Sequence, residues 1–178
     1  MSSSGPAECN KEAQMTNKSN FTPDEWKTLL EGVMMSGVAV SAAEPSGLFG
    51  AIKEGFAESH AIIEASSGPN ELIRSLAAEF ETSAGRTLAR EGLKEKLSGV
   101  QTADIKDKSI AALKEAGALL ESKAPQDATP VKQWLYHISE KVAEADAEGG
   151  FLGFGGTKVT DKEKATLGEI SNALKIAA

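Results

Sequence analysis

Acidic residues stand beside two glycine-containing turns, and these carboxylates are the first candidates for chemistry. Glu44 precedes one turn, and Asp146 and Glu148 precede the other. Carboxylate oxygens are the ligands that hard cations such as Ca²⁺ and Mg²⁺ prefer. The spacing of a calcium loop is missing, because the twelfth position counted from Asp146 is Thr157 rather than glutamate. The sequence therefore leaves the metal, if one binds, unknown.

The two histidines, His60 and His137, are too few for most zinc sites. His60 lies at the edge of the apolar face of its predicted helix, with Glu64 one turn later. We expect His60 to be partly buried and hydrogen-bonded. The alternative is that His60 binds a metal together with the acidic residues of the two turns. The one cysteine, Cys9, stands in a polar tail, and no serine occupies a nucleophile motif. No catalytic residue is predicted.

The stretch from Gly149 to Gly156 combines five glycines with Phe151, Leu152 and Phe154. Glycines at positive φ allow backbone amides to converge on an anion. The nucleotide-binding P-loop is absent, because no Gly-Lys-Ser/Thr closes the stretch. The favoured interpretation is a loop that folds its apolar side chains over the helices. A partner-binding lid and a membrane-associating loop are the alternatives.

Composition narrows the classes of partner. The formal net charge is −7, which disfavours phosphate backbones, so no nucleic acid is expected. No cofactor motif is present. The longest apolar run, Val33 to Ala43, is too short for an integral membrane segment, and the single cysteine suits the cytoplasm. A protein partner or a homo-oligomer stays open.

Helix signals recur along the chain. Thr22 with Glu25, and Thr160 with Glu163, form capping boxes. Helices are predicted to begin at Thr22, Ser46, Asn70, near Ile105, at Thr129 and at Thr160, with a break or bend at 83–85. No stretch alternates as a strand does. We therefore predict an all-α fold: a compact bundle of six or seven helices over residues 21–178, preceded by a disordered tail over residues 1–20.

Apolar residues at three-and-four spacing predict which faces are buried. The predicted stripes are Trp26, Leu29, Leu30, Val33, Met34 and Val38 in the first helix; Phe49, Ile52, Phe56 and Ile63 in the second; and Val131, Trp134, Leu135, Ile138 and Val142 in the helix after Thr129.

Two segments resemble each other. Ala43 to Phe49 and Ala145 to Phe151 both lead from an apolar helix through an acidic residue and a glycine to phenylalanine. Duplication of a helix pair explains the likeness, and so does chance, since helices often end at an acid and a glycine. Duplication would bring the two turns together.

A family resemblance covers Val142 to Leu174. The Ala-Asp-Ala-Glu-Gly-Gly-Phe segment from Ala145 and the capped helix from Thr160 resemble an uncharacterised bacterial all-helical family, and more distantly the TerB-like domains of tellurite resistance. The resemblance implies a stress-related or metal-related role, with the acidic loop positions of the family at Asp146 and Glu163. The glycine-rich stretch departs from the TerB pattern.

These observations favour a non-enzymatic helical accessory or binding protein with a stress-related role. The rivals are a cation-binding protein or metal-dependent enzyme that uses the acidic turns, and a protein that associates with membranes through the glycine-rich loop. The candidate binding residues are Glu44, His60, Asp146, Glu148, Phe151 and Phe154.

Overall fold

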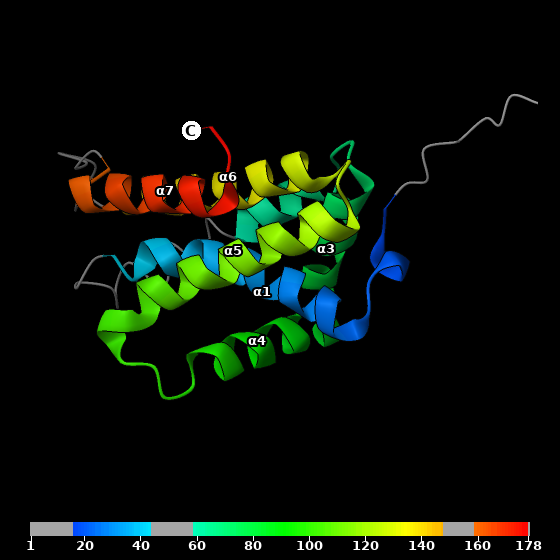
Figure 1. The fold of residues 1–178 in the computed structure, drawn as a ribbon, viewed down its shortest axis with the longest axis horizontal. Coiled ribbons are helices and arrows are strands. Elements are labelled where there is room, and N and C mark those ends of the chain that lie inside the picture. The colour runs from blue at the N-terminus through cyan, green and yellow to red at the C-terminus, as the bar shows by residue number, and fades with distance from the viewer. Residues whose placement is uncertain (1–15, 44–58, 148–158, 178) are drawn as a thin grey trace, which may run out of the picture.

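The computed structural model describes residues 16–43, 59–147 and 159–177. Its α-helices are α1 (Pro23–Ser41), α3 (Glu71–Glu81), α4 (Ser83–Leu97), α5 (Ile105–Lys123), α6 (Ala128–Ala147) and α7 (Asp161–Leu174), with 3₁₀ turns η1 (Lys18–Asn20) and η2 (Thr102–Asp104). Residues 59–65 are also helical, and these ranges contain no strand. The predicted all-α bundle is confirmed (Figure 1).

Helix α1 is the centre of the bundle. It contacts α4, α5, α6 and α7, and Figure 1 shows it between α4 on one side and α6 and α7 on the other. A helix with neighbours on several sides buries more than one stripe of its surface. The buried side of α1 includes Met35, Ala39 and Val40, whereas Met34 and Val38 of the predicted stripe are only half-buried.

Small residues let α1 and α5 approach closely. A Cβ atom added at Gly32 of α1 would stand 2.9 Å from the Cβ of Ala116 on α5. Real Cβ atoms essentially never come that close, so glycine is required for this crossing.

The predicted helix starts are set by local hydrogen bonds. Thr22 and Thr160 each accept from the backbone N–H three residues later, and Glu25 and Glu163 accept in return from the cap N–H, as predicted. Thr82 ends α3 and caps α4, which is the predicted break.

The end of the predicted tail lies within the described residues. Residues 18–20 form η1, and the Nζ of Lys18 lies 2.5 Å from a carboxylate oxygen of Glu79 on α3. Residues 1–15 lie outside the described residues.

The predicted buried face of the second helix is wrong at its only described member. Ile63 is 57% exposed, whereas Ile62 and Ala61 are buried. Neighbouring residues on a helix differ by about 100° in direction, so the buried face lies one residue earlier than predicted.

Candidate functional site

Of the six candidate binding residues, His60 and Asp146 lie within the described residues. The other four, Glu44, Glu148, Phe151 and Phe154, lie outside them. Asp146 belongs to the last turn of α6. In Figure 1, α1 ends at the same end of the molecule at which α7 begins, so the helices that flank the two predicted turns share one end of the bundle.

His60 is not partly buried as expected. Its side chain is 84% exposed, and its Nδ1 lies 4.0 Å from a carboxylate oxygen of Glu64. Ala61 and Ile62 take the inward positions of this helix, which turns His60 to solvent. An exposed imidazole at that distance makes no hydrogen bond of normal length to Glu64.

The described residues offer no metal set. In residues 16–43, 59–147 and 159–177, no three Asp, Glu, His or Cys side chains gather closely enough to hold a metal ion. Glu163, which the TerB-like resemblance marks as an acidic loop position, is buried and accepts the N–H of Thr160 at 2.6 Å. Within the same ranges, no helix combines the length and the apolar character that crossing a bilayer requires.

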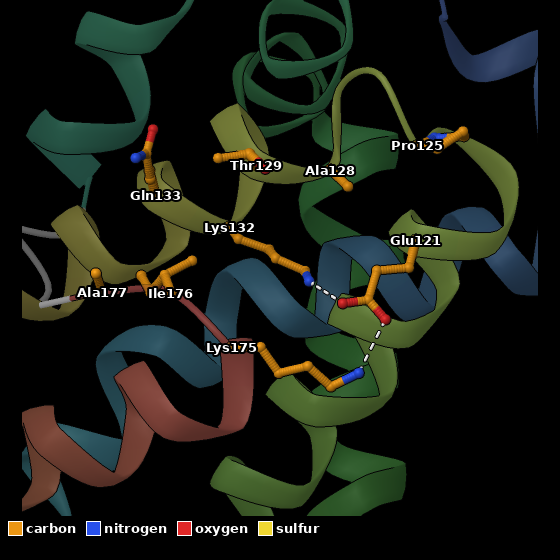
Figure 2. A pocket seen from close by; sticks show the side chains of 9 residues that line it. All are labelled: Glu121, Pro125, Ala128, Thr129, Lys132, Gln133, Lys175, Ile176 and Ala177. Atoms are coloured by element: carbon orange, nitrogen blue, oxygen red, sulfur yellow. Dashed lines mark hydrogen bonds and ion pairs between the residues drawn. The ribbon is translucent and has the colours of Figure 1, made fainter.

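A pocket of about 480 Å³ opens at the other end of α6, some 20 Å from Asp146 by helical rise. It lies between the end of α5, the first turns of α6 and the residues after α7 (Figure 2). The lining residues are Glu121, Pro125, Ala128, Thr129, Lys132, Gln133, Lys175, Ile176 and Ala177. We call this the α5–α6 pocket.

Two lysines share one carboxylate in the α5–α6 pocket. Lys132 Nζ lies 2.5 Å from Glu121 Oε1, and Lys175 Nζ lies 3.0 Å from Oε2. Figure 2 shows each ammonium group bound to a different oxygen of Glu121, Lys132 from α6 and Lys175 from the segment after α7. Hydrogen bonds from Lys132, and then from Lys175, hold the pKa of the Glu121 carboxyl below its ordinary value. The three groups carry one net positive charge.

Lys132 is a lysine on the buried face of its helix. Its side chain is only 6% exposed, and its neighbours Val131 and Leu135 belong to the apolar stripe. A Cβ added at Gly117 of α5 would stand 3.4 Å from Lys132 Cε, so the aliphatic stem lies against α5 where that helix has no side chain. A lysine within a core-facing stripe was the available sequence signal, because lysine is almost never fully buried unless it is paired.

Lys175 occupies a backbone conformation that favours glycine. Its φ is 54° and its ψ is 46°, directly after α7. The N–H of Lys175 donates to Asn172 and that of Ile176 donates to Ser171, which is a Schellman cap. This left-handed turn directs the Lys175 side chain to Glu121, at a cost of about 1 kcal/mol relative to glycine.

The first turn of α6 adds to the positive character of the pocket. Ala128 and Thr129 line the pocket, and this turn contains no acidic residue. The N-terminal end of a helix carries a partial positive charge, part of which is offset by the carboxylate of Asp127, the residue before α6, which also accepts from Asn70. Together with the two ammonium groups, it makes the α5–α6 pocket suited to a small anion.

The chain matches no family model, no curated protein and no solved structure. The resemblance to TerB-like domains therefore stays a prediction, and the function is argued from geometry.

Proposed function

We propose that this chain is a non-enzymatic helical binding protein whose α5–α6 pocket takes up a small oxyanion, such as a carboxylate or phosphate group. The observation that carries the proposal is the nearly buried ammonium of Lys132, which shares Glu121 with a second lysine inside a pocket. A stress-related role is the part of the proposal that rests on the TerB-like resemblance alone.

Desolvation strengthens the attraction that such a site exerts. A charge inside a protein interacts in a lower effective dielectric than water, so an oxyanion beside Lys132 gains more than it would at an exposed lysine. Glu121 pairs with Lys132 in the absence of an anion. Because one carboxylate neutralises only one of the two ammonium groups, Lys175 gives the pocket its excess positive charge. Binding by one small ion is expected in about the millimolar range, near −4 kcal/mol.

Titration with inorganic phosphate and, separately, with acetate tests the proposal. Amide chemical shifts at Thr129, Lys132 and Ile176 are expected to move with a saturable dependence. Lys175→Gly should weaken binding several-fold while keeping the cap of α7, because glycine is the preferred residue in that conformation. Glu121→Gln should strengthen binding, because it removes the competing negative charge and retains an oxygen that accepts from Lys132.

Lys106→Gln is the matched control. Lys106 also pairs with a carboxylate, that of Glu169 at 2.8 Å, but it does not line the α5–α6 pocket. Its replacement should leave anion binding unchanged. The absence of saturable shifts for both anions, or the same affinity in the Lys175→Gly and Glu121→Gln variants, would refute the anion site.

A further inference from the structure

A second group of charges lies where α4 and α5 pack on α1. Lys27 Nζ lies 2.5 Å from a carboxylate oxygen of Glu95, and Lys96 Nζ lies 2.7 Å from one of Glu115. Glu31 of α1 lies between the two lysines. We call these five residues the charge cluster. It is separate from the α5–α6 pocket, with which it shares no residue.

Glu31 is the buried member of the charge cluster. Its side chain is 6% exposed, and the ammonium groups of Lys96 and Lys27 lie 3.6 and 4.0 Å away. These distances exceed those of a normal hydrogen bond. Both lysines are instead hydrogen-bonded to the other two carboxylates of the cluster. The Glu31 side chain is therefore largely buried, with two ammonium groups at ion-pair distance and no hydrogen bond of normal length to either.

Helix α4 covers this carboxyl through a glycine. A Cβ added at Gly92 would stand 2.6 Å from Glu31 Oε1, so the backbone of α4 lies directly on the side chain. The other side of Glu31 faces a pocket of about 330 Å³, which Asp24 and Thr28 also line. Small outward movement of α4 would let water reach the carboxylate from both sides.

The contact between α4 and α1 buries few large apolar side chains of α4. The buried residues of α4 are Gly85, Ala89 and Gly92, which together bury little apolar surface, and Leu88, Leu93 and Leu97 are only partly buried. Elements with few buried apolar contacts open at low free energy. We therefore expect a change of one charge at this interface to alter how often α4 opens.

The charges that face Glu31 act in both directions. Burial, the largest cause, raises the pKa of the Glu31 carboxyl; Lys96 and Lys27 oppose this, and Glu115 adds to it. Asp24 of α1 and Glu95 of α4 are the other acids at the pocket. Since the docked state binds the proton more tightly than the open state, docking weakens as the pH rises through the raised pKa of Glu31.

We propose that Glu31 is a proton-dependent latch for α4: with a proton on Glu31 the helix packs closely on α1, and after loss of the proton α4 opens more often so that water solvates the carboxylate. Acidification therefore tightens α4, until the pH is low enough to protonate Glu95, whose pKa is lowered by its hydrogen bond from Lys27.

Amide hydrogen exchange of α4 between about pH 5 and pH 8, corrected for the intrinsic exchange rate, tests the latch. Protection in α4 is expected to rise as the pH falls, by at most about tenfold per pH unit because one proton is linked. Glu31→Gln, a neutral side chain of the same shape, should make protection in α4 high and independent of pH. Amides of α6, which is remote from the charge cluster, should show no such dependence in either protein.

Three results would overturn the latch. They are constant protection of α4 in the unsubstituted protein, the same pH dependence in Glu31→Gln, and lower protection in Glu31→Gln, which would mean that ionised Glu31 holds α4 in place. A carboxyl ¹³C titration of the unsubstituted protein decides the matter without any variant. If Glu31 titrates no higher than an ordinary glutamate, the proposal is wrong.

Discussion

The hydroxyl of Thr160 begins α7 by accepting the N–H of Glu163 at 3.2 Å. Thr160→Ala removes this acceptor, so we expect the free energy of unfolding to fall by about 1 kcal/mol. Thr87→Ala is the control, because the Thr87 hydroxyl donates back to the carbonyl of Ser83 within α4. Such back-bonding does not help a helix, so Thr87→Ala should be neutral or slightly stabilising. Chemical denaturation measures the change in the free energy of unfolding of each variant. Equal decreases in the two variants would contradict this account.

Single residues differ in how well the sequence predicts their roles. Thr22 and Thr160 could be predicted as caps because their partners stand three residues away. The position of Lys132 beside an apolar stripe was a signal of burial, but its partners could not be predicted, since Glu121 and Lys175 come from α5 and from the end of α7. The burial of Glu31 likewise depends on Gly92 of α4, a helix that follows α1 in the chain only after α3.

At the level of whole helices, substitutions of two glycines in helix interiors distinguish the effect of packing from that of helix propensity. Gly32→Ala would place a Cβ 2.9 Å from that of Ala116, an atom fixed to the backbone of α5. We expect a net loss of about 1–2 kcal/mol, because overpacking outweighs the gain in propensity. Gly168→Ala in α7 meets nothing within 4 Å and should stabilise by about 0.5–1 kcal/mol.

Thermal unfolding of both glycine variants, followed by circular dichroism at 222 nm, measures the difference directly. A stabilising Gly32→Ala would show that α1 and α5 can separate freely, which the close crossing of these helices argues against.

Periodicity predicted the helices better than it predicted their buried faces. The face of α6 was correct, because Val131, Trp134, Leu135, Ile138 and Val142 are all buried. Residues 59–65 were misjudged at Ile63, and the buried side of α1 is wider than the predicted stripe and leaves Met34 and Val38 half-buried. In both cases, the neighbouring helices decide which side is covered, and a helical wheel contains no information about them.

For the molecule as a whole, carboxyl groups whose pKa values are shifted in opposite directions determine how stability depends on pH. Glu25, Glu95 and Glu121 have pKa values lowered below 4.5 in the folded state, chiefly by hydrogen bonds from the N–H of Thr22, from Lys27 and from Lys132. Their contribution is present above the unfolded value and is lost as the pH falls through the folded values. Glu31 acts in the opposite sense, because its raised pKa lowers stability as the pH rises.

We therefore expect the melting temperature to be highest at mildly acidic pH, above the titration of Glu25, Glu95 and Glu121 and below that of Glu31. Thermal scans from about pH 3 to pH 8 test this. The decline on the alkaline side should disappear in Glu31→Gln while the acid decline persists. A melting temperature that keeps rising down to the lowest pH would contradict the lowered pKa values of Glu25, Glu95 and Glu121.

Fold class was the property that the whole sequence specified most clearly, because apolar spacing and caps repeat over almost every segment. The candidate site was not specified in this way. The sequence pointed to the acidic turns and to the glycine-rich stretch, whereas the α5–α6 pocket joins residues from three separate parts of the chain. The proximity of these residues depends on how the helices pack, which no local sequence pattern encodes.

The central position of α1 has a consequence for biosynthesis. Helix α1 is made first among the α-helices described, yet much of its lining comes from α5, α6 and α7, and α5 starts only at Ile105. At ordinary rates of translation, this leaves an apolar segment without its neighbours for on the order of ten seconds. During that interval the apolar surface of α1 is accessible to chaperones and to other nascent chains. Closely spaced ribosomes on one message should therefore lower the yield of folded protein by more than the thermal stability of the folded protein would suggest.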